Sequence, residues 1–209
     1  AKSALYRYGA GVKDQETNMT ESHANEYPLL PLRRGVLLPG SVSTLPVGRK
    51  RSLALVAAVN AGDIIAVASQ REAETQEPTL ADLHPIAVLA KVHRIGRSKD
   101  GSARLVVEAR ERVHLTQLIQ SDPHIKVATT PAPDLNVEST EVMILAESLR
   151  EHVRELAGSE GGSLVEAIAK RLEPSALADA LGAHLPLERH AAVEVLMTLD
   201  VVDRLRLVA

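Results

Sequence analysis

Residues 86–109 read IAVLAKVHRIGRSKDGSARLVVEA, and this stretch carries the clearest local signal of structure in the chain. Apolar and polar side chains alternate in both halves of the stretch, which is the pattern of half-buried strands. Asp100-Gly101 lies between the two halves. This dipeptide favours a tight turn, because glycine readily adopts the left-handed backbone conformation that such turns require. The sequence therefore predicts a β-hairpin.

Short apolar segments on either side extend the β pattern from Tyr27 to about Thr130. Before the hairpin, the segments LLPL, VLLP and TLPV are interrupted by four prolines: Pro28, Pro31, Pro39 and Pro46. Proline is tolerated at sheet edges and bulges rather than in central strands, so this region is predicted to be kinked and bulged. Further strands are expected at 63–69, 113–119 and 125–130.

One helix is predicted to interrupt these strands, at about residues 49–61. Gly62 follows it at the position where a glycine ends many helices. A half-dozen short strands with a single helix indicate a small, partly closed β-barrel.

The spacing of apolar residues changes from 2 to 3.6 after Pro131-Ala132-Pro133. One helical stripe follows, ending near Gly158 and formed by Val142, Leu145, Leu149, Val153 and Leu156. Shorter helices are expected at 163–172, 175–183 and 187–198, and Asp200 is placed to cap a last one. The prediction is an α+β protein: a leader without regular structure over 1–26, a β-rich domain over 27–131 and an all-α helical bundle over 137–209. We expect the two parts to have separate cores, joined near residues 131–136.

Composition excludes several classes of function. The 209 residues contain no Cys, Phe or Trp and carry a formal net charge of -3. Without cysteine there are no disulfides, thiolate metal sites or thiol nucleophiles, which fits a reducing compartment. The scarcity of aromatic side chains, which are three tyrosines, and the lack of a basic excess argue against a nucleic-acid partner. No apolar run approaches the ~20 residues that span a bilayer, and the first residues do not form a secretory leader. We therefore expect a cytoplasmic protein without a membrane partner.

The motifs of common catalytic sites are also missing. Gly35 and Gly40 have the glycine spacing of a phosphate-binding loop, but Ser41 and Val42 stand where lysine and Ser/Thr are needed. We interpret the two glycines as turn residues around a bulged strand. Ser163 follows two glycines but opens a helical pattern, so it is better placed as a helix cap than as a nucleophile. The eight histidines form no H-E-x-x-H motif. We expect no catalytic residue, no metal, no cofactor, and neither ATP hydrolysis nor proteolysis by this chain.

Three groups of motifs follow one another along the chain. The first is Pro28-Leu29-Leu30-Pro31-Leu32-Arg33, continued by Leu38-Pro39-Gly40 and Val47-Gly48-Arg49, and it is similar to the opening signature of the amino-terminal domain of Lon-type ATP-dependent proteases. Its hairpin and following strand resemble Lys99-Asp100-Gly101, then Leu105–Ala109 and Arg112. Its later helical segments resemble Leu177-Ala178-Asp179, the AHLPL stretch at 183–187 and LDVVDRL at 199–205. The order and spacing of these motifs make the resemblance specific, although Arg34, Pro46 and Lys50-Arg51 depart from the family's usual residues.

The resemblance implies a PUA-like β pseudo-barrel followed by a helical subdomain. In the family these parts precede an ATPase module and a Ser-Lys protease module, which use ATP and Mg²⁺ and whose motifs are not in this sequence. The implied function is recognition of unfolded or degron-bearing proteins, with self-association into a hexamer in the full-length protein. The alternative is a free-standing binding or adaptor module of the same fold, for a ligand, a protein or RNA.

A cluster of cations is the candidate substrate or partner surface. Residues 27–62 contain no acidic residue but include Arg33, Arg34, Arg49, Lys50 and Arg51. Three of these lie at the predicted start of the first helix, where the macrodipole disfavours each cation by roughly 0.3–1 kcal/mol. Charges kept against the local electrostatics suggest a use in binding. The alternative is a solvated rim, balanced by Glu72, Glu74 and Glu77 of the following loop.

Overall fold

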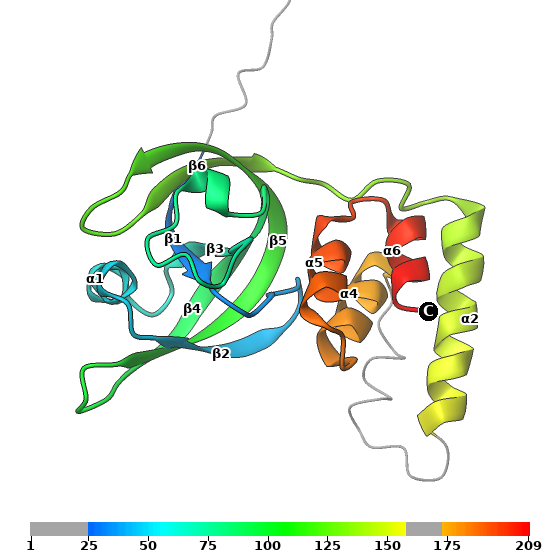
Figure 1. Ribbon diagram of the computed structural model, residues 1–209. Coiled ribbons are helices and arrows are strands. Elements are labelled where there is room, and N and C mark those ends of the chain that lie inside the picture. Colours follow the sequence, from blue (N-terminus) through cyan, green and yellow to red (C-terminus); the bar gives the residue numbers. More distant parts are fainter. Residues whose placement is uncertain (1–24, 158–172) are drawn as a thin grey trace, which may run out of the picture.

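The computed structural model describes residues 25–157 and 173–209. A β-rich half lies beside a group of helices (Figure 1), in the chain order that the periodicity predicts. The predicted leader, up to residue 24, and the helix predicted at 163–172 lie outside the described residues. The boundaries 27–131 and 137–209 stay predictions.

Six strands form one sheet: β1 (Asn25–Leu32), β2 (Val42–Val47), β3 (Ile64–Ser69), β4 (Ile86–Arg97), β5 (Ala103–Gln120) and β6 (Lys126–Pro131). Their order is β2-β5-β4-β3-β1-β6, and an additional pairing of β5 with β6 closes the sheet on itself. β1 runs parallel to β3, and the other pairs are antiparallel. The predicted hairpin is β4–β5.

β5 replaces two of the predicted strands. The segments expected at 105–109 and 113–119 form a single strand, whose first half pairs with β2 and β4 and whose second half pairs with β6. Register shifts in both of its long ladders let the strand bend without ending. Because β5 bends, its first half can pair with β2 while its second half pairs with β6, which closes the sheet.

The VLLP segment at 36–39 is not a strand, and that prediction was wrong. It belongs to the loop that joins β1 to β2, and Leu37 and Leu38 are buried there. Gly40, with a φ of 76°, supplies the turn that leads into β2. The segment is apolar because it enters the core, and an apolar run by itself does not distinguish a buried loop from a strand.

The interrupting helix, α1 (Lys50–Ala58), is shorter than predicted. Val59 ends it, and Leu55, Val56 and Val59 are its buried apolar positions. Gly62, with a φ of 102°, therefore lies in the next turn rather than at the helix end. Its N–H donates to the carbonyl of Val92, 2.7 Å away. A short 3₁₀ turn, η1 (Leu80–Asp82), follows β3.

The described helices of the second half are α2 (Thr140–Ala157), α4 (Pro174–His184), α5 (Arg189–Met197) and α6 (Val201–Leu207). Val142 and Leu149, from the predicted stripe of α2, are buried, as the 3.6-residue period indicates. Asp200 caps α6 by accepting hydrogen bonds from the N–H groups of Val202 and Asp203. Among the described residues, no helix combines the length and the apolar character that a bilayer crossing requires.

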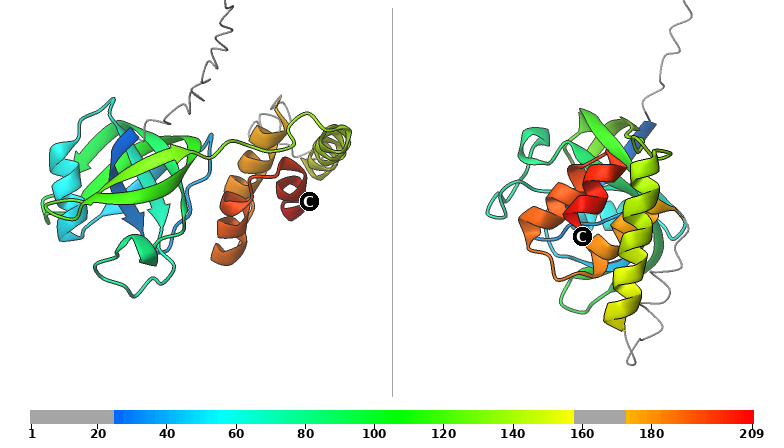
Figure 2. Two further views of the ribbon diagram at one scale, coloured as in Figure 1. Left: turned by 90° about the horizontal axis from the view of Figure 1, so that it is seen from above. Right: turned by 90° about the vertical axis from the view of Figure 1, so that its right-hand side faces the viewer.

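The two halves share one core, contrary to the prediction of separate cores. A single cluster of buried side chains runs from the barrel, with Leu38 and Val107, to the helices, with Leu177 and Leu205. Figure 2 shows α4 and α5 on the side of the group that faces the barrel. A smaller second cluster contains residues of the β-rich half alone. The helices are therefore part of the barrel's packing.

A buried network of charges also joins the halves. Arg112 of β5 donates two hydrogen bonds to the carboxylate of Asp179 in α4, at 2.8 and 2.6 Å, and one to the carbonyl of Leu196 in α5, at 2.9 Å. Arg204 of α6 donates to Asp134 in the connecting segment at 2.6 Å and lies 3.6 Å from Asp179. The carboxylates of Asp134 and Asp179 balance the two guanidinium groups, which is what allows both arginines to be buried.

A buried histidine is expected to make stability depend on pH. His124 is 7% exposed, and its Nδ1 has no hydrogen-bond partner among the described residues. Burial first, and Lys126 second, lowers its pKa. The unfolded chain takes up a proton near pH 6.5, whereas the folded chain resists it. The contribution of neutral His124 to the free energy of unfolding is therefore complete above about pH 6.5 and declines as the pH falls towards the lowered pKa.

The measurement is urea unfolding at about pH 7.5 and about pH 5.5 for the wild type and a His124→Asn variant. We expect the variant to lose less stability on acidification than the wild type does. His190→Gln, at an exposed position, should lose as much stability on acidification as the wild type does. If His124→Asn also lost as much stability as the wild type, the pH dependence would not come from His124.

Candidate functional site

Two adjoining hollows lie along β1 in the wall of the barrel, one towards α1 and the other towards β2. The first, of about 680 Å³, lies between α1, β1 and the turn that precedes β6. The second, of about 800 Å³, lies between β1, the loop after it and β2. Both are lined by Pro31, Arg49, Ser52 and Gln76. We call the two hollows together the seam trough.

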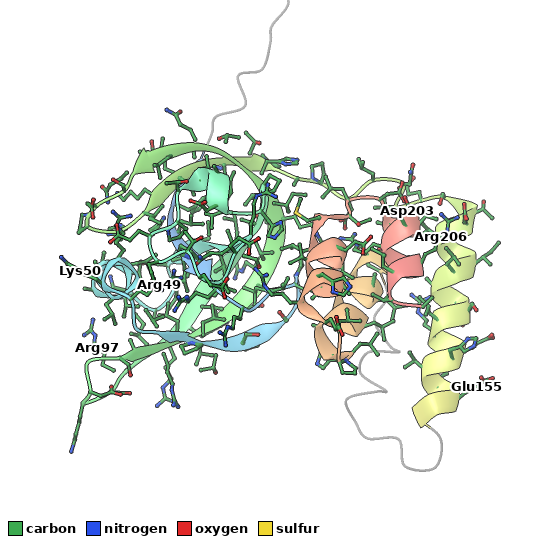
Figure 3. All side chains as sticks on the ribbon, viewed as in Figure 1. Arg49, Lys50, Arg97, Glu155, Asp203 and Arg206 are labelled. Carbon is green, nitrogen blue, oxygen red and sulfur yellow. The ribbon has the colours of Figure 1, made fainter. Side chains whose placement is uncertain are left out.

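All five cations singled out in the sequence line the seam trough. Arg33 and Arg34 line the larger hollow, Lys50 and Arg51 the smaller one, and Arg49 both. Figure 3 shows Arg49 on the side of α1 that faces the strands and Lys50 on its outer side. The sequence placed these residues in one segment, and the fold arranges them around one depression.

Arg49 holds the middle of the seam trough together. Its Nη2 donates to the carbonyl oxygen of Pro31 at 2.8 Å, and its Nη1 donates to Oε1 of buried Gln70 at 2.6 Å and to the carbonyl of Gln76 at 3.3 Å. Burial, and then the neighbouring charge of Arg33, lowers the pKa of Arg49. The side chain thus joins α1, β1 and the loop after β3, and it separates the two hollows.

Arg33 and Arg51 are also engaged within the chain. Arg33 donates to the carbonyl of Ala73 at 2.9 Å. Arg51 forms ion pairs with Asp122, at 3.2 Å, and with Glu77, at 3.3 Å. Of the three acidic residues expected to balance the cations, Glu77 is the one that forms an ion pair with them among the described residues. The other partner, Asp122, lies 71 residues away in sequence, and sequence reasoning missed it.

Arg34 and Lys50 are the two exposed cations of the seam trough. Neither has an ion-pair partner within residues 25–157 and 173–209. The lining contains five cations and three carboxylates, those of Glu74, Glu77 and Asp122, so an excess of two positive charges remains. The N-terminus of α1 has no side-chain cap and no acidic residue in its first turn, and its dipole adds to this positive potential.

The lining of the seam trough combines apolar and charged groups. Its walls are apolar side chains and prolines, and its rim carries positive charge. Across the part of the chain that the structure describes, no group of three His, Asp or Glu side chains is arranged to hold a metal ion. Gln70 and Gln76, which anchor Arg49, carry no local sequence signal that would have predicted their role.

The model of the ATP-dependent protease La (LON) substrate-binding domain matches residues 26–209. The chain belongs to this family. Lon protease 4 of Sorangium cellulosum is 45% identical over 184 residues, which are 88% of this chain and 23% of that protein. Lon protease of Anaeromyxobacter dehalogenans is 32% identical over 87% of this chain and 22% of its own length. The chain thus spans less than a quarter of these Lon relatives.

Solved structures of Lon amino-terminal domains share this fold. The N-terminal domain of Mycobacterium avium complex Lon protease superposes with a TM-score of 0.71 at 22% identity, covering 88% of this chain and 96% of that one. The Lon N-terminal domain protein from Xanthomonas campestris gives a TM-score of 0.58 at 20% identity. At these identities the likeness concerns the fold, a β-sheet core with helices.

Proposed function

We propose that this chain recognises unfolded or degron-bearing proteins and binds them in the seam trough. It does so as the non-catalytic amino-terminal region of an ATP-dependent protease, acting in the cytoplasm. ATP and Mg²⁺ are used by other parts of that protein, and this chain holds no cofactor. The proposal is supported by the family and by relatives that are Lon proteases more than four times longer than the matched region.

The observation that carries the proposal is an apolar depression with an unbalanced positive rim. Unfolded proteins expose apolar side chains that a native fold would bury, and hollows of these volumes lie in the range that accommodates several side chains. Arg34 and Lys50, which lack an ion-pair partner in the described part of the chain, can attract acidic residues that flank such segments. The other three cations keep the walls in place.

Two broader features belong to the same proposal. The closed six-stranded sheet is the PUA-like pseudo-barrel that the family resemblance implies, and the closing β5–β6 pairing supports this. Self-association, up to a hexamer in the full-length protein, follows from the resemblance alone. Sedimentation of the full-length protein and of this chain would separate the contributions of the two regions.

A double variant, Arg34→Glu with Lys50→Glu, tests the binding site. It leaves Arg49 and Arg51 in place, because their contacts hold α1 against the barrel. We expect the Kd for a fluorescent, reduced and carboxymethylated α-lactalbumin to rise by roughly threefold to tenfold, with the larger loss at low salt.

The matched control reverses two exposed cations that line neither hollow, Arg94→Glu with Lys99→Glu. It changes the net charge by the same amount and should leave the Kd nearly unchanged. Equal weakening by both doubles would show that overall charge matters and that the seam trough is not the site. A wild-type chain that binds no unfolded protein would refute the proposed function itself.

A further inference from the structure

The outer edge of β2 is an open strand edge. β2 lies at the end of the strand order and pairs only with β5 among the described residues. The carbonyl of Ser41 accepts from the N–H of Ala109 at 2.8 Å, which fixes the alternation of main-chain groups along the strand. The main-chain N–H and C=O groups of Ser43, Leu45 and Val47 face β5. Those of Val42 and Thr44, and the C=O of Pro46, face away from it. Such an edge is a template for another strand.

β1, on the opposite side of the seam trough, offers no such edge for pairing. Pro31 of β1 has no N–H, and its carbonyl already accepts from Arg49. The N–H of Leu29 donates to the carbonyl of Ile125 at 2.8 Å. Among the described residues, the strand edge that remains for a segment entering the trough is therefore that of β2. Because Pro46 also lacks an N–H, the outward donors of β2 are those of Val42 and Thr44, which restricts the register.

The side chains near this edge suit an extended apolar segment. Ser43, Leu45, Pro46 and Val47 line the larger hollow, so every second side chain of an added strand would lie over an apolar wall. Val42 is 66% exposed, although it is a β-branched apolar residue. Arg34 lines the same hollow without an ion-pair partner among the described residues, and Glu74 is the hollow's one carboxylate.

We propose that the outer edge of β2 binds an extended peptide segment as an added β-strand. The segment is apolar at alternate positions, which face the larger hollow, and carries an acidic residue that pairs with Arg34. This proposal rests on the proposed function, and it specifies the conformation and the chemistry of the bound part of the substrate. Main-chain bonds to Val42 and Thr44 provide affinity for any sequence, and the hollow and Arg34 provide preference.

The substitution that tests strand addition is Thr44→Pro. It removes an outward N–H without touching the ladder to β5, and Pro46 shows that this edge accepts proline. The probe is a fluorescein-labelled decapeptide in which valine alternates with aspartate and serine, titrated against the 209-residue chain. We expect Thr44→Pro to weaken binding about tenfold, whereas the control Thr44→Val, which keeps the N–H, binds like the wild type. Thermal unfolding of each variant reports whether the fold is kept.

A second measurement uses the wild-type chain alone and holds even where Thr44→Pro fails to fold. Two decapeptides are N-methylated, one on the odd and one on the even amides. Strand addition requires that only one of the two loses binding, because alternate amides face β2. Equal binding of both, or unchanged binding by a folded Thr44→Pro variant, overturns the inference and leaves side-chain docking in the trough. A wild-type chain that binds neither the peptide nor an unfolded protein overturns the proposed function as well.

Discussion

Replacing Asp179 with alanine is expected to lower the free energy of unfolding by about 3–5 kcal/mol, the usual consequence of removing one partner from a buried ion pair. Asp179 is 3% exposed and accepts two hydrogen bonds from Arg112. It also lies 3.6 Å from Arg204, which is fully buried. Without its carboxylate, the two buried guanidinium groups would keep Asp134, which is 27% exposed, as their one ion-pair partner among the described residues. Urea unfolding followed by circular dichroism measures the loss.

The control for this variant is Asp203→Ala. Asp203 accepts a hydrogen bond of 2.8 Å from Arg206 on the exposed face of α6, and it precedes Arg204 in the sequence. Exposed pairs of this kind contribute little, so we expect a change within about 0.5 kcal/mol. If Asp179→Ala were no more costly than Asp203→Ala, the buried network would not hold the helices to the barrel.

Leu38→Ala is expected to cost about 2–5 kcal/mol, the range for truncating a fully buried leucine. Leu38 lies in a loop, yet it is 2% exposed and belongs to the core that the barrel and helices share. A Cβ added at Gly182 of α4 would approach its Cδ1 to 2.9 Å, so loop and helix are in close contact. We expect strands and helices to unfold in one transition, at a lower urea concentration than in the wild type.

Val42→Ala is the matched control, because it also removes methyl groups but from a side chain that is mostly exposed. Its effect on stability should stay within about 0.5 kcal/mol. Two separate transitions in the Leu38→Ala variant, with the helices melting independently of the sheet, would restore the prediction of separate cores.

Local patterns determined the elements whose signals lie close together in the sequence. The alternation around Asp100-Gly101 predicted the β4–β5 hairpin, and the period of 3.6 residues predicted α2. Asp200 was correctly predicted to cap α6. The ordered motifs identified the family, which the match over residues 26–209 confirms. Each of these depends on neighbours within a few residues, so one sequence is sufficient to read them.

The contacts between groups that are distant in the sequence are seen in the folded chain and are not indicated by local patterns. Arg112 and Asp179 are 67 residues apart, and both belong to motifs that carry the family resemblance, yet nothing local indicates that they form a pair. Nor does any local pattern indicate that Arg51 pairs with Asp122, or that Arg49 donates a hydrogen bond to the carbonyl of Pro31. Periodicity says that a side chain is buried but not against what, which is why Leu38 was assigned to a strand. Which distant residues form contacts depends on how the chain closes into a barrel and on how buried charges are balanced. Both are properties of the whole fold.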